Sequence, residues 1–306
     1  MSKTKEGKRR PFAWTKYQLD KLNKVKIILE ELEEFKPLTL RQIHYQFVGK
    51  NYIKNNESQY NMLSKLIKHA RLDGYILWTD IEDRVRSCHD LSGWKNADAY
   101  KSSSMDGFLT NYHRDLTLSQ DVYLEIWIEK DALSSIFIKV ASKYTVPVAV
   151  CRGFSSVSFL NDYKTRLSYA QCRRPVLLYF GDFDPSGVEM LKSMETTLKD
   201  ELKVERIEFK RIALQKEDID LYNLPHSPEA LKKKDTRAKK HVAEFGELAV
   251  ELDALPPAVL QNKIKMAIEG ELIMDLFMME QDVEASEIKE LTILRNEVKE
   301  LVERLM

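Results

Sequence analysis

Three carboxylate side chains directly follow two apolar segments that lie about fifty residues apart in the sequence. Glu129 closes the first segment, VYLEIWIE, and Asp182 and Asp184 close the second, PVLLYFGDFD. If these segments are neighbouring parallel strands, the three carboxylates meet at the carboxyl edge of one sheet, where open α/β sheets place their ligands. Oxygen ligands without His or Cys suit Mg²⁺, or Mn²⁺ in its place. The pattern therefore predicts a divalent-metal site and points to phosphoryl chemistry.

The residues around the carboxylates support this prediction. Asp182 and Asp184 are two positions apart, so an extended backbone directs both side chains to the same side. The stretch 185–187, Pro-Ser-Gly, turns into a helix whose amino end can face a phosphate. Acidic residues after strands are also common as loop residues and helix caps. A single Asp-x-Asp would be weak evidence, whereas two acidic strand ends within one α/β unit are more specific.

The elements that would position these residues form a repeating pattern between residues 121 and 225. Apolar runs of strand length alternate there with amphipathic helical runs, which predicts an α/β domain with a parallel sheet. We expect strands at 122–128, 146–151, 176–180 and 205–213, and helices at 131–144, 155–169 and 186–203.

Two further regions flank this domain. A polar connector is expected over residues 86–120, with at most one short helix. A C-terminal extension is expected over residues 226–306. Its apolar periodicity predicts helices at 257–282 and 284–305, and the second of these has a heptad-like pattern.

The amino-terminal region, residues 13–85, has the pattern of a mostly α-helical domain. Three amphipathic helices are expected before a short apolar strand at 75–81. The first covers 15–35, the second follows Thr39, and the third follows Ser58, with Thr39 and Ser58 as N-caps. Three helices and a β-ribbon predict a winged-helix domain, although any small three-helix unit would show the same periodicity. The third helix carries three candidate DNA contacts, Lys65, Lys68 and Arg71.

The distribution of charge favours a nucleic-acid partner although the 306-residue chain has no net charge. Residues 1–75 contain 16 Lys or Arg against 8 Asp or Glu, whereas residues 271–306 contain ten acidic and four basic side chains. A basic front indicates a local polyanion footprint that the whole-chain charge hides. Residues 1–12 read as a disordered basic arm.

The composition also restricts the cellular setting. Hydrophobic residues make up 43% of the chain, and no apolar run approaches the roughly 20 residues that span a membrane. The three cysteines are far apart in the sequence and lack metal-ligand spacing. We therefore expect a soluble protein of a reducing cytoplasm, without a membrane partner.

The two acidic motifs, IWIEKDA and YFGDFDPSG, resemble the two signature motifs of the Toprim domain. That domain occurs in type IA and type II topoisomerases, bacterial primases and overcoming-lysogenization-defect nucleases. The resemblance implies that Glu129, Asp182 and Asp184 handle Mg²⁺. The form GDFDPSG is most similar to the A subunit of topoisomerase VI and its meiotic double-strand-break relatives. Residues 37–260 are similar to shortened, stand-alone bacterial and phage homologues of that subunit.

That branch of the family carries a nucleophilic tyrosine in a winged-helix domain ahead of the Toprim domain. The segment TLRQIHYQF matches its local pattern at Arg41 and Tyr45, whereas His44 stands where the family has an aromatic residue. The resemblance implies that the Tyr45 hydroxyl attacks a phosphodiester and that Arg41, one helical turn earlier, binds the phosphate. A core aromatic in an amphipathic helix is the alternative role for Tyr45.

Four further residues are candidates for supporting the metal ligands from behind. Lys130 and Asp131 begin the helix after the first acidic strand, and Glu251 and Asp253 lie in the family-like stretch VELDALPP. Glu251 and Asp253 also fit the description of surface carboxylates before a Pro-Pro turn. Both readings remain open from the sequence.

The resemblance implies a Mg²⁺-dependent DNA-cleaving transesterase of the type IIB topoisomerase A-subunit class. Tyr45 would form a 5′-phosphotyrosyl intermediate with double-stranded DNA, and the chain would act as a homodimer in a bacterial, archaeal or phage-infected cell. The chain contains no Gly-rich ATP-binding motif, so strand passage would need a B-type ATPase partner. Two alternatives are a Toprim nuclease that uses metal-activated water, as in phage or plasmid defence, and a non-catalytic DNA-binding module.

Overall fold

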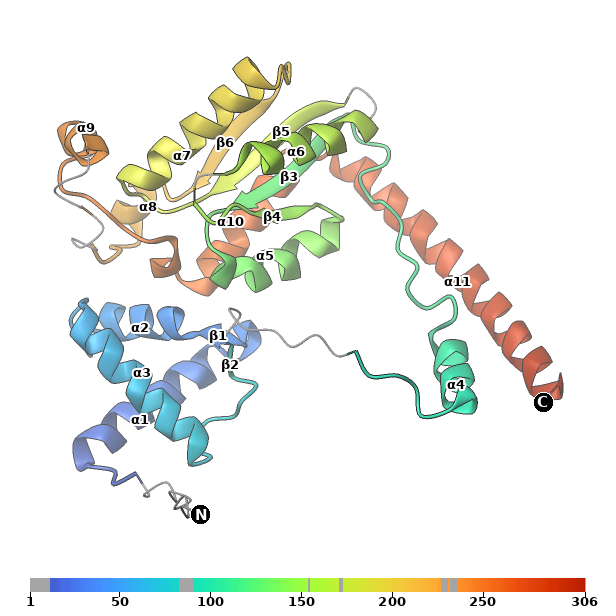
Figure 1. The fold of residues 1–306 in the computed structure, drawn as a ribbon, viewed down its shortest axis with the longest axis horizontal. Coiled ribbons are helices and arrows are strands. Elements are labelled where there is room, and N and C mark those ends of the chain that lie inside the picture. The colour runs from blue at the N-terminus through green and yellow to red at the C-terminus, as the bar shows by residue number, and fades with distance from the viewer. Residues whose placement is uncertain are drawn as a thin grey trace, which may run out of the picture.

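The computed structural model describes residues 12–82, 91–153, 155–170, 173–226, 231 and 236–305. Within these ranges the protein consists of an amino-terminal helical domain, an α/β domain and a long C-terminal helix (Figure 1). The predicted basic arm lies outside the described residues except for Phe12. The boundary expected at residues 85 and 86 also lies outside them.

The helical domain contains the three predicted helices, α1 (Lys16–Glu31), α2 (Leu40–Gly49) and α3 (Glu57–Leu72). Thr39 caps α2 in a capping box: its hydroxyl accepts from the Gln42 N–H, and the Gln42 side chain accepts from the Thr39 N–H. The expected cap of α3, Ser58, is wrong. Asn56 accepts from the Gln59 N–H at 3.0 Å, so the helix begins earlier.

The expected strand at 75–81 is mostly a turn. Only its end belongs to β2 (Ile81–Glu82), which pairs in parallel with β1 (Leu38–Thr39). Gly74, with a φ of +76°, provides the left-handed backbone at which the chain leaves α3. Residues 83–90 are not described, so a wing hairpin is not part of the described structure. The coarse α-helical character of this domain is confirmed, and the winged helix remains a prediction.

The predicted parallel sheet is confirmed. It contains β3 (Val122–Ile128), β4 (Val148–Val150), β5 (Arg174–Phe180) and β6 (Glu208–Ala213) in the order β4-β3-β5-β6. In the register of the two central strands, Ile128 lies opposite Phe180. The residues that follow these two strands are therefore neighbours at one edge of the sheet.

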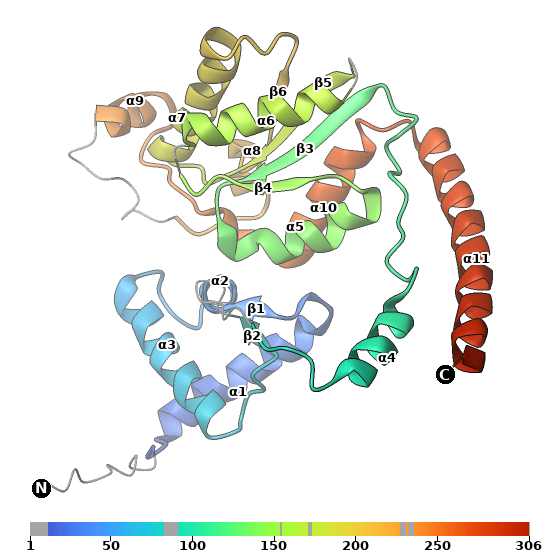
Figure 2. The ribbon, with the colours of Figure 1, turned by 45° about the vertical axis from the view of Figure 1, so that its right-hand side comes forward.

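Helices cover both faces of this sheet (Figures 1 and 2). Side chains such as Ile126 and Phe180 pack on the face that carries α5 (Ser134–Ala141) and α10 (Pro257–Glu269). Alternate side chains such as Trp127 and Tyr179 form a second core on the other face, with α6 (Val157–Tyr169) and α7 (Pro185–Thr196). The shorter elements are the 3₁₀ turns η2 (Asp131–Leu133) and η3 (Ser142–Tyr144), the π-helical turn η4 (Thr197–Glu201) and α8 (Lys216–Leu221).

Part of the C-terminal extension completes the α/β domain. After α9 (Thr236–Phe245), Val250 pairs with Phe183 in an antiparallel bridge, and the 3₁₀ turn η6 (Leu252–Ala254) follows. Ile264 and Ile268 of α10 belong to the core beneath the sheet.

The two expected C-terminal helices have different bounds from those predicted. Gly270 ends α10, and α11 (Met274–Leu305) then runs without a break through residue 283. The chain has no Gly or Pro after Gly270, so nothing interrupts this helix. The connector contains one helix, α4 (Ala97–Gly107). None of the helices in the described ranges has the length and apolar character that a membrane crossing requires.

Candidate functional site

Glu129 lies at the end of β3, against the backbone of the loop that follows β5. Its Oε2 accepts a hydrogen bond from the Asp182 N–H at 2.9 Å. Two glycines leave the space for this carboxylate. A Cβ at Gly181 would lie 2.8 Å from Glu129 Oε2, and a Cβ at Gly187 would lie 3.2 Å from it and 2.3 Å from the Asp182 carbonyl oxygen. The glycines of the GDFDPSG motif therefore form a cradle for the Glu129 side chain.

The two aspartates of that motif have different surroundings. Asp182 is buried, and its Oδ1 accepts from the Leu252 N–H at 2.8 Å. Asp184 caps α7, since its Oδ1 accepts from the Gly187 N–H at 2.6 Å. Asp184 is thus a helix cap, a common role of acidic residues after strands. The cap uses one of the two carboxylate oxygens of Asp184.

Lys130 connects the acidic loop to the segment around η6. Its Nζ lies 2.9 Å from a carboxylate oxygen of each of three residues, Asp182, Glu251 and Asp253. Burial disfavours the charged ammonium, but the three carboxylates raise the pKa of Lys130 well above its usual value. Lys130 therefore stays protonated and offsets part of the negative charge of the site.

The remaining negative charge is crowded. Burial, followed by the charge of Asp182, raises the pKa of Glu129 to about 7. Burial raises the pKa of Asp182 to about 6, although Lys130 and the Leu252 N–H act in the opposite direction. A nearby cation would lower the pKa of both carboxyls, since a positive charge favours their ionised forms.

The donor chemistry of the site suits Mg²⁺, but the predicted ligands are not gathered into a preformed cluster. Across the described residues, no group of three or more His, Cys, Asp or Glu side chains is close enough together to hold a metal ion. Glu129 and Asp182 lie side by side, while Asp184 is turned to its capping contact. Asp253 Oδ1 is buried and has no hydrogen-bond partner in the described part of the chain. The residues therefore fit a hard cation in type, but the three carboxylates do not meet around one point in the described structure.

Arg211 of β6 is a site residue that the sequence did not indicate. Its Nη2 donates to the Asp182 carbonyl oxygen at 2.5 Å, its Nη1 to that of Gly187 at 3.1 Å, and its Nε to that of Leu214 at 2.8 Å. This half-buried side chain fixes the backbone of the acidic loop. It was missed because its partners are carbonyl groups, which leave no pattern of side chains in the sequence.

Arg41 and Tyr45 of α2 lie at the contact between the helical domain and the α/β domain. Arg41 forms an ion pair with Glu251, and Glu251 also contacts Lys130. Burial opposes the charge of Arg41, whereas Glu251 and Asp253 raise its pKa. Glu251 in turn has a lowered pKa because Lys130 and Arg41 outweigh its burial. Asp253 is buried and Glu251 is half-buried, so neither is a freely exposed surface carboxylate, and their role near a metal remains a prediction.

Tyr45 is buried in this arrangement. It is 6% exposed and belongs to the apolar core of the α/β domain, together with Leu252 and Leu255. The neighbouring His44 ring lies 5.5 Å from the Tyr45 ring, and burial lowers the pKa of His44. The structure therefore gives Tyr45 a packing role at the domain contact, one helical turn from Arg41 on α2.

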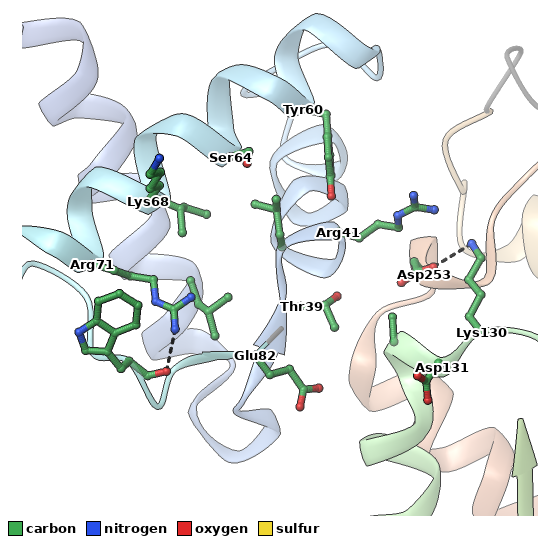
Figure 3. A pocket seen from close by; sticks show the side chains of 15 residues that line it. Thr39, Arg41, Tyr60, Ser64, Lys68, Arg71, Glu82, Lys130, Asp131 and Asp253 are labelled. Atoms are coloured by element: carbon green, nitrogen blue, oxygen red, sulfur yellow. Dashed lines mark hydrogen bonds and ion pairs between the residues drawn. The ribbon is translucent and has the colours of Figure 1, made fainter. Parts of the chain in front are cut away.

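An open groove of about 710 Å³ lies between the helical domain and the start of α5. Figure 3 shows Lys68 and Arg71 of α3 on one side of the groove. On the other side, Arg41 of α2 points toward Lys130 and Asp253. Arg71 lies over the Trp78 ring at 4.3 Å and donates to the Trp78 carbonyl oxygen.

Two other predicted residues differ in their relation to this groove. Asp131 also lines it and pairs with Arg152 at 2.7 Å. Lys65, the third predicted DNA contact, is exposed on α3 and is not among the groove-lining residues.

No model of a known protein family matches this chain, and a search of curated proteins finds no match either. The resemblance to Toprim proteins therefore remains a prediction from the sequence motifs.

Proposed function

We propose that the protein is a Mg²⁺-dependent DNA-cleaving transesterase that resembles the A subunit of type IIB topoisomerases. The observation that carries the proposal is the contact between Glu129 Oε2 and the Asp182 N–H at 2.9 Å. This contact brings two acidic motifs from separate strands to one sheet edge, beside a groove that contains Arg41, Lys68 and Arg71. The groove is also lined by Glu82, Asp131 and Asp253, so its cations rather than its net charge would bind phosphates. A carboxylate site next to such cations suits cleavage of a phosphodiester backbone.

Glu129, Asp182 and Asp184 would hold Mg²⁺, which when bound supplies charge neutralisation at a scissile phosphate. The residues around them have distinct tasks. Arg211 fixes the loop backbone. Lys130 forms ion pairs with both Asp182 and Asp253 of η6. Asp184 keeps one oxygen on the Gly187 N–H and can direct its other oxygen to the cation.

In this proposal the Tyr45 hydroxyl attacks the phosphate while Arg41 binds a phosphate oxygen. The Tyr45–phosphorus bond forms as the bond between phosphorus and the 3′ oxygen breaks. The tyrosine hydroxyl loses its proton and the leaving 3′ oxygen gains one, so one phosphoester replaces another. Because Tyr45 is 6% exposed, its packing against the η6 segment and the Arg41–Glu251 ion pair must open first. A homodimer, in which the tyrosine of one copy meets the carboxylates of the other, and a B-type ATPase partner belong to the same proposal.

A Toprim nuclease is the second candidate function, and the burial of Tyr45 favours it. Water activated at the carboxylates would then replace the tyrosine as the nucleophile. This reaction needs no separation of the two domains, because Glu129 and Asp182 already lie together.

One experiment separates these functions. Supercoiled plasmid is incubated with the full chain and Mg²⁺, stopped with detergent, and analysed with and without protease. The transesterase gives protease-sensitive DNA adducts in the wild type and in Tyr60→Phe, a control at a groove tyrosine, but not in Tyr45→Phe. Cleavage without adducts that persists in Tyr45→Phe supports the nuclease. If Asp182→Asn leaves all DNA cleavage unchanged, both proposals fail.

A further inference from the structure

The C-terminal helix α11 is 32 residues long, which corresponds to about 48 Å at 1.5 Å per residue. Figures 1 and 2 show it projecting beyond the α/β domain, with α4 beside its carboxyl-terminal part. A projecting helix depends on packing of an apolar face, because helix propensity alone gives little stability. The faces of α11 therefore indicate what it contacts.

The first half of α11 has an acidic face whose charges are matched within the chain. The Arg114 guanidinium donates to Glu280 at 2.5 Å and to Glu287 at 2.9 Å, and the Arg114 N–H donates to Glu284 at 2.9 Å. The Tyr112 hydroxyl also hydrogen-bonds Glu287. The three glutamates are four and three residues apart, so they occupy the a and d positions of a heptad.

After Glu287 the same heptad positions become apolar. They are Leu291, Leu294, Val298 and Leu301, which we call the α11 seam. Leu294 and Leu301 are 47% and 56% exposed, and the other two side chains are half-buried. The acidic part of this face is covered by the connector, and its apolar part presents large side chains to solvent.

Helix α4 lies beside α11 across a gap, at the e-position edge of the α11 seam. Lys299 pairs with Asp106 of α4 at 3.2 Å, and Val302 lies in the gap between the two helices. Tyr100 of α4 lines this gap and is 54% exposed, and Trp94, 60% exposed, lies 5.5 Å from its ring. The two helices thus form an arm with more apolar surface than the α11 seam alone.

We propose that the α11 seam pairs with the seam of a second copy of this chain in a parallel coiled coil. The flanking charges identify the partner. Glu290 occupies a g position and Arg295 the following e position, and in a parallel pair each Glu290 faces the partner's Arg295. The two-fold symmetry of a homodimer places this one charge pair on each side of the seam, whereas the next pair, Glu297 and Val302, adds none. With α4 from each copy, the assembly contains four helices, which offsets the shortness of a two-heptad seam. This inference does not rest on DNA cleavage.

Sedimentation equilibrium of the full chain at micromolar concentration tests the proposal. The wild type is expected to be a dimer, and the double variant Leu294→Glu, Leu301→Glu a monomer with unchanged helical circular dichroism. Ile293→Glu is the matched control, because Ile293 is 61% exposed but occupies a c position outside the seam, so this variant stays dimeric. A monomeric wild type, or a dimer that survives the double variant, overturns the proposal.

Cysteine cross-linking and charge reversal test the orientation and the identity of the partner. With Cys88, Cys151 and Cys172 replaced by Ser, Leu294→Cys should form a disulfide-linked dimer on mild oxidation and Ile293→Cys should not. A parallel pair places d positions side by side, so failure of the Leu294→Cys link contradicts it. Glu290→Arg and Arg295→Glu should each weaken the dimer several-fold, and combining them should restore it. A double variant as weak as the single ones overturns the charge pairing.

Discussion

The Lys130 ammonium lies 2.9 Å from Asp182 Oδ2, so a carboxylate predicted to bind Mg²⁺ already faces a fixed cation of the same chain. The same ammonium contacts Glu251, and Glu251 is paired with Arg41 of the helical domain. A line of alternating charges thus runs from the acidic loop to the domain contact. Changes at the candidate site are therefore coupled to the position of the helical domain.

Removing the Lys130 charge should destabilise the fold. Lys130→Met leaves buried carboxylates without their cation, and breaking a buried pair in this way typically costs about 3 kcal/mol or more. The free energy of unfolding from urea denaturation at pH 7.5 measures the effect. Lys199→Met is the control, because Lys199 forms an exposed pair with Glu195, and it should change stability by less than about 0.5 kcal/mol. Equal effects of the two substitutions would contradict the assigned role of Lys130.

The pKa of Glu129, raised to about 7, predicts a pH dependence of stability in the metal-free protein. A carboxyl with a higher pKa in the folded state binds more protons when folded. Its stabilising contribution is complete below the ordinary pKa of 4.5 and is lost as the pH rises through about 7.

Unfolding measured in EDTA between pH 4.5 and pH 8 should therefore show a decline that Glu129→Gln reduces, by an amount on the order of 2 kcal/mol. Asp182 shares this direction, so part of the decline persists in the variant. Mg²⁺ added at pH 8 should restore stability to the wild type more than to the variant. A Glu129→Gln curve parallel to the wild type would show that Glu129 does not titrate in this range.

The glycine cradle should not accept a methyl group. In Gly187→Ala the new Cβ would lie 2.3 Å from the Asp182 carbonyl oxygen, so the acidic loop has to move. We expect a loss of about 1–3 kcal/mol in stability and a loss of DNA cleavage. Gly107→Ala is the control, because no atom lies within 4 Å of a Cβ there. Thermal denaturation and the plasmid assay measure the two effects. If Gly187→Ala behaved like the control in both, the close approach of Glu129 and Asp182 to Gly187 would be wrong.

Arg211 should act through the loop backbone rather than through its charge alone. Arg211→Lys keeps the charge but cannot reach the carbonyl oxygens of Asp182, Gly187 and Leu214 at once. The affinity for Mg²⁺, measured by calorimetry, should fall about tenfold or more, in the range seen for residues that orient metal ligands. Arg206→Lys, at an exposed position, should leave it unchanged. Full affinity in Arg211→Lys would assign Arg211 a purely electrostatic role.

Binding of DNA should depend on the groove-lining cations of α3 more than on its outer ones. Lys68→Ala and Arg71→Ala should each weaken binding to duplex DNA and reduce the slope of log K against log salt by about one. Lys65→Ala is the comparison on the same helix, outside the groove, and should have the smaller effect. Fluorescence anisotropy across a salt series measures both quantities. An effect of Lys65 equal to that of the other two would place the DNA elsewhere on α3.

The sequence alone determined the parallel sheet and the meeting of the acidic motifs. Continuous apolar runs such as 122–128 identify buried strands, and strands of equal direction end at the same edge, so Glu129 and Asp182 had to approach one another. Helical periodicity likewise located α1, α2 and α3. These features depend on local patterns, which are written directly in neighbouring residues.

Only the tertiary structure decided which side chains meet at that edge. The ion pair between Arg41 and Glu251 joins positions 210 residues apart, and the contacts of Arg211 go to backbone carbonyls. The burial of Tyr45 depends on how α2 packs against η6, which the amphipathic pattern of α2 does not specify. Such contacts arise from the close packing of distant segments. A periodic pattern states which face of an element is buried, but it does not state what that face is buried against.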